Sequence, residues 1–217
     1  NVASLGFGHA ASIISAAEDA GLSRAVFVST AAISTRLKAE SRSTRVEAEM
    51  AIRSSALAWT IIRPTMIYGE PGDRNMERLL GALRRLPAIP LPGAGRGLQQ
   101  PVHVQDVAGA LASVLDRAIS VGRTYVIAGP HPLPLRVVVE QAAVAVGRAP
   151  ILVPVPLAPA VAMTRVYEGL ARRPRLRAEQ VARLGEDKAF DITPASKDLG
   201  YLPRTFAEGI TAEALSQ

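Results

Sequence analysis

Two apolar runs of the chain each end in residues that can hydrogen-bond a ligand or line a flat ring. Ala25–Val28 is followed at once by the hydroxyl residues Ser29 and Thr30. Trp59–Arg63 is stopped by Pro64, because proline has no amide hydrogen for strand pairing. The backbone turns there, so the next three residues can offer amide groups and apolar surface to a flat ring; they are Thr65, Met66 and Ile67.

Two further segments carry polar residues beside an expected helix. Gln100–Ala108 contains His103 and Asp106. The Asp106 carboxylate can accept hydrogen bonds from the free amides of a first helical turn, and we expect His103 to support a substrate loop rather than to act as a base. Asn75 follows Gly72–Arg74 and could contact a substrate or cap the next helix. The sequence leaves both roles of Asn75 open.

The closing segments complete a set of motifs. They are Phe190–Asp191 and Lys197–Pro203, with a Leu-Gly-Tyr-x-Pro turn. With segments 25–30, 59–69 and 100–108, they resemble the extended and atypical short-chain dehydrogenases/reductases, which include nucleotide-sugar epimerases and dehydratases. The resemblance implies NAD or NADP beside a pocket for a small-molecule substrate. On the cofactor side it implies Ala3, Ser4, Ser29, Thr30, Arg45, Pro64, Thr65, Met66 and Ile67, and on the substrate side Asn75 and His103.

The chain departs from that family at its proton-transfer pair. The family has Tyr-x-x-x-Lys before a glutamate, and the lysine lowers the pKa of the tyrosine so that it can exchange a proton with the substrate. Counting back from Glu49, the lysine position holds Arg45 and the tyrosine position holds Ser41. Arg45 can still bond a ribose hydroxyl or a phosphate, but a serine hydroxyl is a far poorer acid than a phenol. Tyr68 could substitute, although packing suits its Tyr-Gly motif better; we therefore assign no catalytic residue.

Two functions follow from the resemblance and the departure. The first is an NAD(P)-dependent enzyme of the epimerase/dehydratase or reductase type, acting on a nucleotide sugar or another small carbonyl compound. The second is a non-catalytic NAD(P)-binding sensor or assembly subunit, which the Ser41 and Arg45 substitutions favour. Resemblance of fold does not choose between them.

The glycine-rich turn that binds pyrophosphate is missing from the sequence. Residues 5–9, Leu-Gly-Phe-Gly-His, follow no visible strand and lack a third glycine, so we do not interpret them as that turn. Asn1–Ser4 instead resembles the end of the family's fourth strand. We therefore expect the phosphate-binding half of the domain, with the residue that distinguishes NAD from NADP, upstream of Asn1.

The expected elements alternate along the chain. Helical periodicity covers 9–20, 44–55, 74–86, 107–115 and 135–146, and buried strands are indicated at 25–28, 59–64 and 124–129. This order predicts an α/β fold, a partial Rossmann-like doubly wound parallel sheet. Residues 87–97, dense in proline and glycine, are predicted to be a loop. We assign residues 1–149 to the C-terminal part of the NAD(P)-binding domain, and 150–217 to a small, mostly helical substrate-side lobe that does not fold independently.

Composition limits the remaining classes. With 217 residues, 48% of them hydrophobic, the chain can bury a core. The absence of cysteine excludes disulfides and thiolate metal sites, and a cytoplasmic location is the expectation. The apolar stretch 150–163 contains four prolines and predicts no membrane span. The arginines within 172–177 have no interleaved aromatics, so we expect a solvated loop rather than a nucleic-acid site. The family resemblance implies a homodimer.

Overall fold

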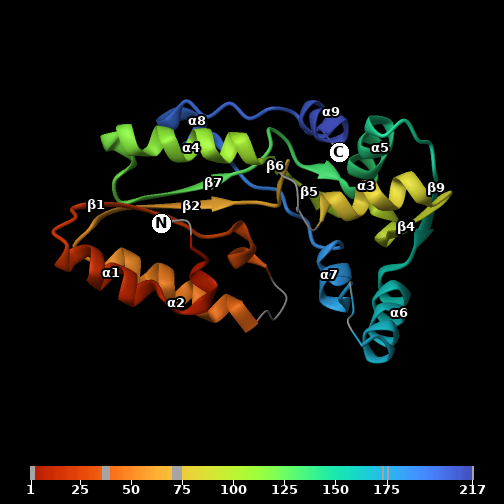
Figure 1. Ribbon diagram of the computed structural model, residues 1–217, viewed down its shortest axis with the longest axis horizontal. Coiled ribbons are helices and arrows are strands. Elements are labelled where there is room, and N and C mark those ends of the chain that lie inside the picture. The colour runs from red at the N-terminus through yellow and green to blue at the C-terminus, as the bar shows by residue number, and fades with distance from the viewer. Residues whose placement is uncertain (1–2, 36–39, 70–74, 173, 175, 217) are drawn as a thin grey trace. The chain divides into compact units, whose positions relative to one another are not determined.

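The computed structural model describes residues 3–35, 40–69, 75–172, 174 and 176–216 (Figure 1). Its residues form two compact units that are interleaved along the chain. The first unit comprises 1–67, 104–128 and 191–203, and the second comprises 68–103, 129–190 and 204–217. The assignment of 1–149 to the cofactor-binding part of the protein stays a prediction.

A three-stranded parallel sheet forms the centre of the first unit. Its strands lie in the order β1 (Arg24–Val28), β2 (Ala58–Pro64) and β7 (Arg123–Ile127). Ala25 pairs with Trp59, and Pro64 pairs with Ile127. The sequence prediction that the hydroxyl-ended strand and the proline-stopped strand lie side by side in a parallel sheet is therefore confirmed.

Helices cover both faces of this sheet (Figure 1). α1 (Ala10–Asp19) and α2 (Glu40–Ser54) lie on one face, and α4 (Val104–Asp116) and α8 (Thr193–Leu199) lie on the other. Phe27 and Ile61 pack with Ile14 and Ile52 of α1 and α2 in one core cluster. Parallel strands covered on both faces are mostly apolar, as β1 and β2 are, and the predicted Rossmann-like α/β class is confirmed. Short 3-10 turns η1 (Leu5–Phe7), η2 (Ala31–Ser34) and η4 (Ala118–Ser120) complete the unit.

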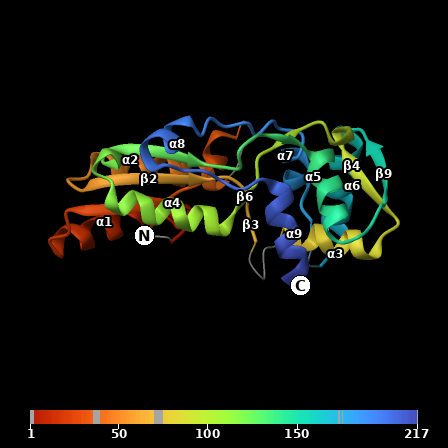
Figure 2. The ribbon, with the colours of Figure 1, turned by 90° about the horizontal axis from the view of Figure 1, so that it is seen from above.

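The second unit is built from short strands and helices. Its strands are β4 (Ala88–Pro92), β5 (Leu98–Gln99), β6 (Val102–His103), β8 (Leu133–Pro134) and β9 (Ile151–Val155), and β3 (Ile67–Tyr68) pairs with β6. Its helices are α3 (Met76–Arg85), α5 (Leu135–Ala145), α6 (Leu157–Leu170), α7 (Ala178–Arg183) and α9 (Phe206–Ser216). α5 packs against α3 and α9 (Figure 2), and α6 packs against α7.

The prediction that residues 87–97 are a loop is wrong, because β4 and the 3-10 turn η3 (Gly93–Gly95) lie there. β4 pairs in parallel with β9, and Pro90 stands opposite Val153 while Leu91 stands opposite Pro154. Proline is tolerated because both strands of a two-stranded sheet are edges, where one side of each strand needs no amide donor. The proline content that suggested a loop therefore marks an edge strand.

Helix boundaries differ from the periodicity in two places. α2 begins at Glu40, before the predicted start near residue 44, and α4 begins at Val104. Asp106 consequently lies inside the first turn of α4 rather than before it, where its negative charge still faces the positive end of the helix dipole. Among the described residues, no helix is long and apolar enough to cross a membrane.

Candidate functional site

The carboxyl-terminal edge of the sheet in the first unit carries most of the residues predicted to bind the cofactor. The Ser29 amide donates to the Ile62 carbonyl (2.7 Å), and the Thr65 amide donates to the Ile127 carbonyl (3.0 Å). These bonds extend the parallel pairing beyond β1 and β2, so Ser29 and Thr65 lie at the same edge. In open α/β sheets, ligands bind outside this edge.

The two hydroxyl groups after β1 have different surroundings. Thr30 Oγ1 accepts a hydrogen bond from the Ala32 amide (3.2 Å) and caps η2. Ser29 Oγ is buried and makes no hydrogen bond to any described residue, although the hydroxyl is near enough to Glu49 to help lower the pKa of that carboxyl group. Ser29 therefore carries the unsatisfied polar atom of this edge.

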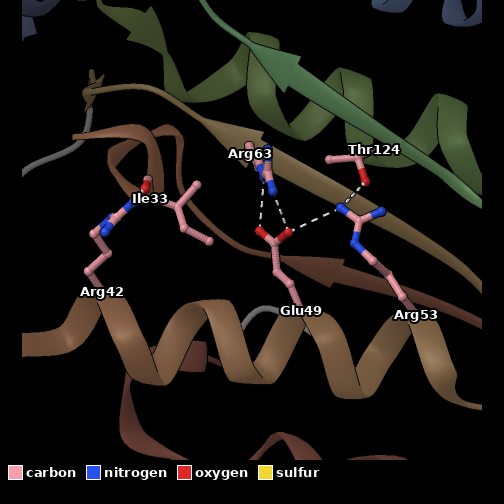
Figure 3. A network of polar contacts seen from close by, with 6 residues as sticks. All are labelled: Ile33, Arg42, Glu49, Arg53, Arg63 and Thr124. Carbon is pink, nitrogen blue, oxygen red and sulfur yellow. Dashed lines mark hydrogen bonds and ion pairs between the residues drawn. The ribbon is translucent and has the colours of Figure 1, made fainter. Parts of the chain in front are cut away.

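A buried ion pair lies between α2 and the end of β2 (Figure 3). Glu49 of α2 is only 3% exposed, and Arg63 of β2 holds both of its carboxylate oxygens, with Nε to Oε1 at 2.9 Å and a terminal nitrogen to Oε2 at 2.5 Å. Arg53, one helical turn beyond Glu49, adds a bond of 3.2 Å to Oε2 and a second bond of 2.9 Å to Thr124 of β7. The cluster ties α2 to two strands of the sheet.

Opposing effects act on the pKa of Glu49, and their net result is a lowered pKa. Burial raises it, whereas the hydrogen bond from Arg63, the nearby Ser29 hydroxyl, the charge of Arg63 and the hydrogen bond from Arg53 together lower it by more. Glu49 is therefore ionised at neutral pH although its side chain is buried.

A cavity of about 350 Å³ adjoins the ion pair. Its lining joins three guanidinium groups to one carboxylate, so the positive charges outnumber the negative. In Figure 3, Arg42 reaches across from α2 to the Ile33 carbonyl (3.0 Å). The lining residues are Ile33, Ser34, Arg42, Val46, Glu49, Met50, Arg53 and Arg63.

Arg45, at the position of the family's lysine, lies against the segment that begins the chain. Its guanidinium atoms are 3.0 to 3.3 Å from the point where a side chain on Gly6 would begin, so Gly6 leaves room for the arginine. Ser4 accepts from the Gly6 amide (3.3 Å), and both Ala3 and Ser4 are exposed. The structure thus brings Arg45 to the segment predicted to contact the cofactor. The side chain of Ser41 lies outside the described residues.

The segment after β2 passes from the core to the surface. Pro64 is buried, Thr65 and Met66 are half-buried, and Ile67 is 38% exposed at the start of β3. The predicted role of these residues in lining a flat ring stays a prediction.

The two substrate-side residues, Asn75 and His103, belong to the second unit. Asn75 is exposed at the N-cap position of α3, where its backbone carbonyl accepts from Leu79 but its side chain makes no capping bond. Residues 70–74, which precede it, lie outside the described residues. His103 is 5% exposed, and its ring meets that of Tyr68 edge-on at 5.3 Å between centroids. Tyr68 also packs on Phe206, consistent with a packing role.

Gly69 makes the position of His103 sensitive to one substitution. Gly69 has φ of +103°, and a Cβ there would clash with the imidazole ring of His103. We expect Gly69→Ala to lower the free energy of unfolding by about 2 kcal/mol, because it adds backbone strain and a steric clash. Urea denaturation measures this, with Gly81→Ala as the control, since its Cβ would meet nothing within 4 Å. Equal effects of the two substitutions would contradict the packing described.

Sequence reasoning missed a polar pair of the second unit. Lys188 Nζ donates to Gln99 Oε1 (2.7 Å), and burial lowers the pKa of Lys188 to about 8. Gln99 is 2% exposed, and its Nε2 makes no hydrogen bond to a described residue. These donors can bind an oxygen-rich group. No local pattern signals the pair, because the two residues are 89 positions apart.

The Glu49 cluster was missed as well, although the sequence contains two signals for it. Arg63 is the one charge in the strand segment 58–64, and a charge in a buried strand requires a partner. Glu49 and Arg53 have the i, i+4 spacing of an ion pair on a helix. In the sequence prediction, Glu49 served only to locate the Tyr-x-x-x-Lys positions.

Comparisons with known proteins agree with this geometry. A family model described as NAD(P)H-binding matches residues 3–118, more than half of the chain. The 2-alkyl-3-oxoalkanoate reductase of Stenotrophomonas maltophilia (strain K279a) is 27% identical over 169 residues, which are 73% of this chain and 51% of that protein. The mitochondrial NADH dehydrogenase (ubiquinone) 1 alpha subcomplex subunit 9 of Arabidopsis thaliana is 32% identical over 116 residues, 53% of this chain and 29% of that protein.

A solved structure extends the comparison to the fold. The UDP-glucuronic acid 4-epimerase from Bacillus cereus in complex with NAD is similar with a TM-score of 0.71 and 14% identity, over 94% of this chain and 64% of that one. At that identity the similarity concerns the fold alone. The chain spans about half the length of the reductase and less of the NADH dehydrogenase subunit.

Proposed function

Because the chain belongs to the NAD(P)H-binding family and is an atypical short-chain dehydrogenase/reductase with NAD or NADP as its cofactor, we propose that it transfers hydride between that cofactor and a small carbonyl compound. The proposed substrate classes are 3-oxo acids and nucleotide sugars. The observation that carries the proposal is the pair of parallel strands whose carboxyl ends present Ser29 and Thr65 at one edge.

The residues at that edge fit a dinucleotide. The unsatisfied Ser29 hydroxyl can hydrogen-bond a polar group of the ligand, and the half-buried Met66 and exposed Ile67 can lie along the nicotinamide ring. Arg45 can bond a ribose hydroxyl or a phosphate. The remaining residues we assign to the cofactor are Ala3, Ser4, Thr30, Pro64 and Thr65.

When bound, the reduced cofactor would supply a hydride to the carbonyl carbon, and the oxidised cofactor would accept one from the corresponding alcohol carbon. The chain must orient the carbonyl, keep water away and move a proton at the carbonyl oxygen. We assign the orientation to Ser29 and Thr30. Glu49 and Arg63 would act behind them by fixing α2 to β2. Serine at the tyrosine position makes proton transfer by a phenol impossible at that position.

The second candidate is a non-catalytic NAD(P)-binding subunit. It is favoured by the replacement of the Tyr-x-x-x-Lys pair by Ser41 and Arg45. The similarity to a subunit of the NADH dehydrogenase alpha subcomplex supports it in a general way, because a subunit of an assembly can keep a nucleotide fold without turnover.

Fluorescence titration of the full-length protein with NADH and NADPH tests the cofactor residues. We expect Arg45→Gln to weaken binding about tenfold, the loss of one charge-assisted hydrogen bond. Arg123→Gln is the matched control, because this exposed arginine begins β7 at the opposite end of the sheet. Equal binding by the two variants would remove Arg45 from the site, and absence of binding by the unaltered protein would overturn both candidate functions.

Turnover separates the two candidates. NADPH oxidation is followed with a 3-oxo acid, and conversion of the sugar in the presence of NAD or NADP is followed with a nucleotide sugar. If the chain is an enzyme, we expect Ser29→Ala to reduce kcat at least about tenfold while dinucleotide binding persists. Binding without turnover of either probe would favour the non-catalytic subunit.

A further inference from the structure

One side of α6 presents apolar side chains to solvent. Met163, Val166 and Leu170 are 70%, 63% and 81% exposed, and Tyr167 is 41% exposed. Their spacing of three and four residues places them on the same side of the helix. We call these four residues the α6 stripe. A contiguous apolar surface of this kind marks a binding surface for protein or membrane.

The opposite side of α6 is anchored within the second unit. Thr164 is buried, and the helix packs along α7. The Glu168 carboxylate accepts a hydrogen bond from the Ala178 amide at the start of α7 (2.9 Å). Packing on α7 therefore uses the other face of the helix and leaves the stripe uncovered.

The sequence that follows the stripe carries mostly positive charge. Arg172 and Arg177, after the end of α6, are exposed, and Glu168 is the single acidic residue between Leu157 and Arg177. The Glu168 carboxylate lies on the side of α6 that faces the start of α7. Leu176, between the two arginines, is a further exposed apolar side chain.

We propose that the α6 stripe binds the surface of an anionic lipid bilayer, with Arg172 and Arg177 contacting lipid phosphates. Apolar side chains bordered by cations are typical of helices that lie in the interfacial region, and tyrosine suits the boundary between headgroups and acyl chains. Anionic lipid provides the complementary charge. A bilayer fits the stripe better than a protein partner does, because three of its four side chains offer no hydrogen-bonding group for specific recognition.

Cosedimentation of the full-length protein with vesicles tests the proposal. The vesicles are phosphatidylcholine with or without phosphatidylglycerol at about one part in four. We expect binding only to the anionic vesicles, weakened by salt. Met163→Glu with Leu170→Glu should reduce the bound-to-free ratio at least about tenfold, and Arg172→Gln with Arg177→Gln should remove most of the dependence on phosphatidylglycerol. Val144→Glu is the matched control, since Val144 is 77% exposed on α5 of the same unit, and it should bind normally.

A spectroscopic measurement keeps the test independent of variant stability. The chain has no cysteine, so Val166→Cys and Val144→Cys each give a single site for an environment-sensitive fluorophore. Only the label at 166 should shift to shorter wavelength on anionic vesicles. Failure to bind those vesicles, unchanged binding of the Met163/Leu170 variant, or equal shifts at 166 and 144 would overturn the proposal. If the Met163/Leu170 variant instead converted a dimer into monomers and the unaltered protein bound no vesicles, the stripe would belong to an interface between copies.

Discussion

Replacement of Arg63 by methionine is expected to lower the free energy of unfolding by about 3 kcal/mol at neutral pH. Arg63 holds both oxygens of Glu49, and Glu49 is 3% exposed. Without Arg63, the buried Glu49 carboxylate keeps the weaker hydrogen bond from Arg53. The folded protein is then destabilised by a buried negative charge that is not fully neutralised. Urea or guanidinium denaturation with matched slopes measures the difference.

The pH dependence of the free energy of unfolding tests whether the Glu49 carboxylate causes this loss of stability. Its pKa in the folded protein lies below the ordinary value of 4.5, so ionised Glu49 contributes stability that is fully present above pH 4.5 and is lost as the pH falls through the lower folded pKa. Removal of Arg63 abolishes most of that contribution. The gap in stability between the unaltered protein and Arg63→Met should therefore narrow as the pH falls below 4.5, and Glu49→Gln should show little of this acid-dependent component.

Arg53→Met is the matched control for this prediction. Arg53 bonds the same carboxylate, but its side chain is 40% exposed and solvated. Its loss should cost at most about 1 kcal/mol, including the contact of its guanidinium with the Trp59 ring. A loss at Arg53 as large as that at Arg63, or a gap that does not change with pH, would show that the bidentate pair is not what stabilises α2 on the sheet.

Replacement of Arg24 by methionine is the second large effect that we expect, again about 3 kcal/mol of unfolding free energy. Arg24 begins β1, and its guanidinium donates to the Ala58 carbonyl (2.6 Å), the Thr60 hydroxyl (2.8 Å) and the Ser120 hydroxyl (2.8 Å). It also donates to the carbonyls of Ala25 and Val114. Thr60 and Ser120 are fully buried, so loss of the donor leaves acceptors with reduced hydrogen bonding.

Arg24 lies away from the strand ends proposed to bind the cofactor, so its replacement should change stability without changing cofactor binding. These hydrogen bonds hold the amino-terminal ends of β1 and β2 against η4. The strand residues proposed to bind the cofactor lie at the carboxyl-terminal ends of the same two strands. Arg24→Lys should recover only part of the stability, because an ammonium has fewer donors and no planar fork. Dinucleotide affinity of the folded Arg24→Met variant should stay within about twofold of the unaltered protein. A variant that is as stable as the control Arg123→Met would contradict this role.

The strands of the central parallel sheet, and the residues that end them, could be predicted from the sequence alone. Ala25–Val28 and Trp59–Ile62 are short runs rich in apolar, β-branched and aromatic residues, and the carboxyl ends of two such parallel strands must meet at one edge. Ser29, Thr30 and the segment from Pro64 to Ile67 could therefore be chosen as site residues before the fold was known. The helices could be predicted in the same way, because the periodic spacing of apolar residues is a local property of the sequence.

Contacts between residues far apart in the sequence could be found only from the tertiary structure. Arg24 and Ser120 are separated by 96 positions, and Arg63 and Glu49 by 14, so no pattern within one element specifies either contact. The pairing of β4 with β9 could not be predicted for the same reason. A proline-rich segment can form a strand only at the edge of a sheet, and whether it lies at an edge depends on its partner strand. Periodicity indicates whether one segment prefers to be a helix or a strand. Ion pairs and strand pairing depend instead on how the surfaces of different segments fit together.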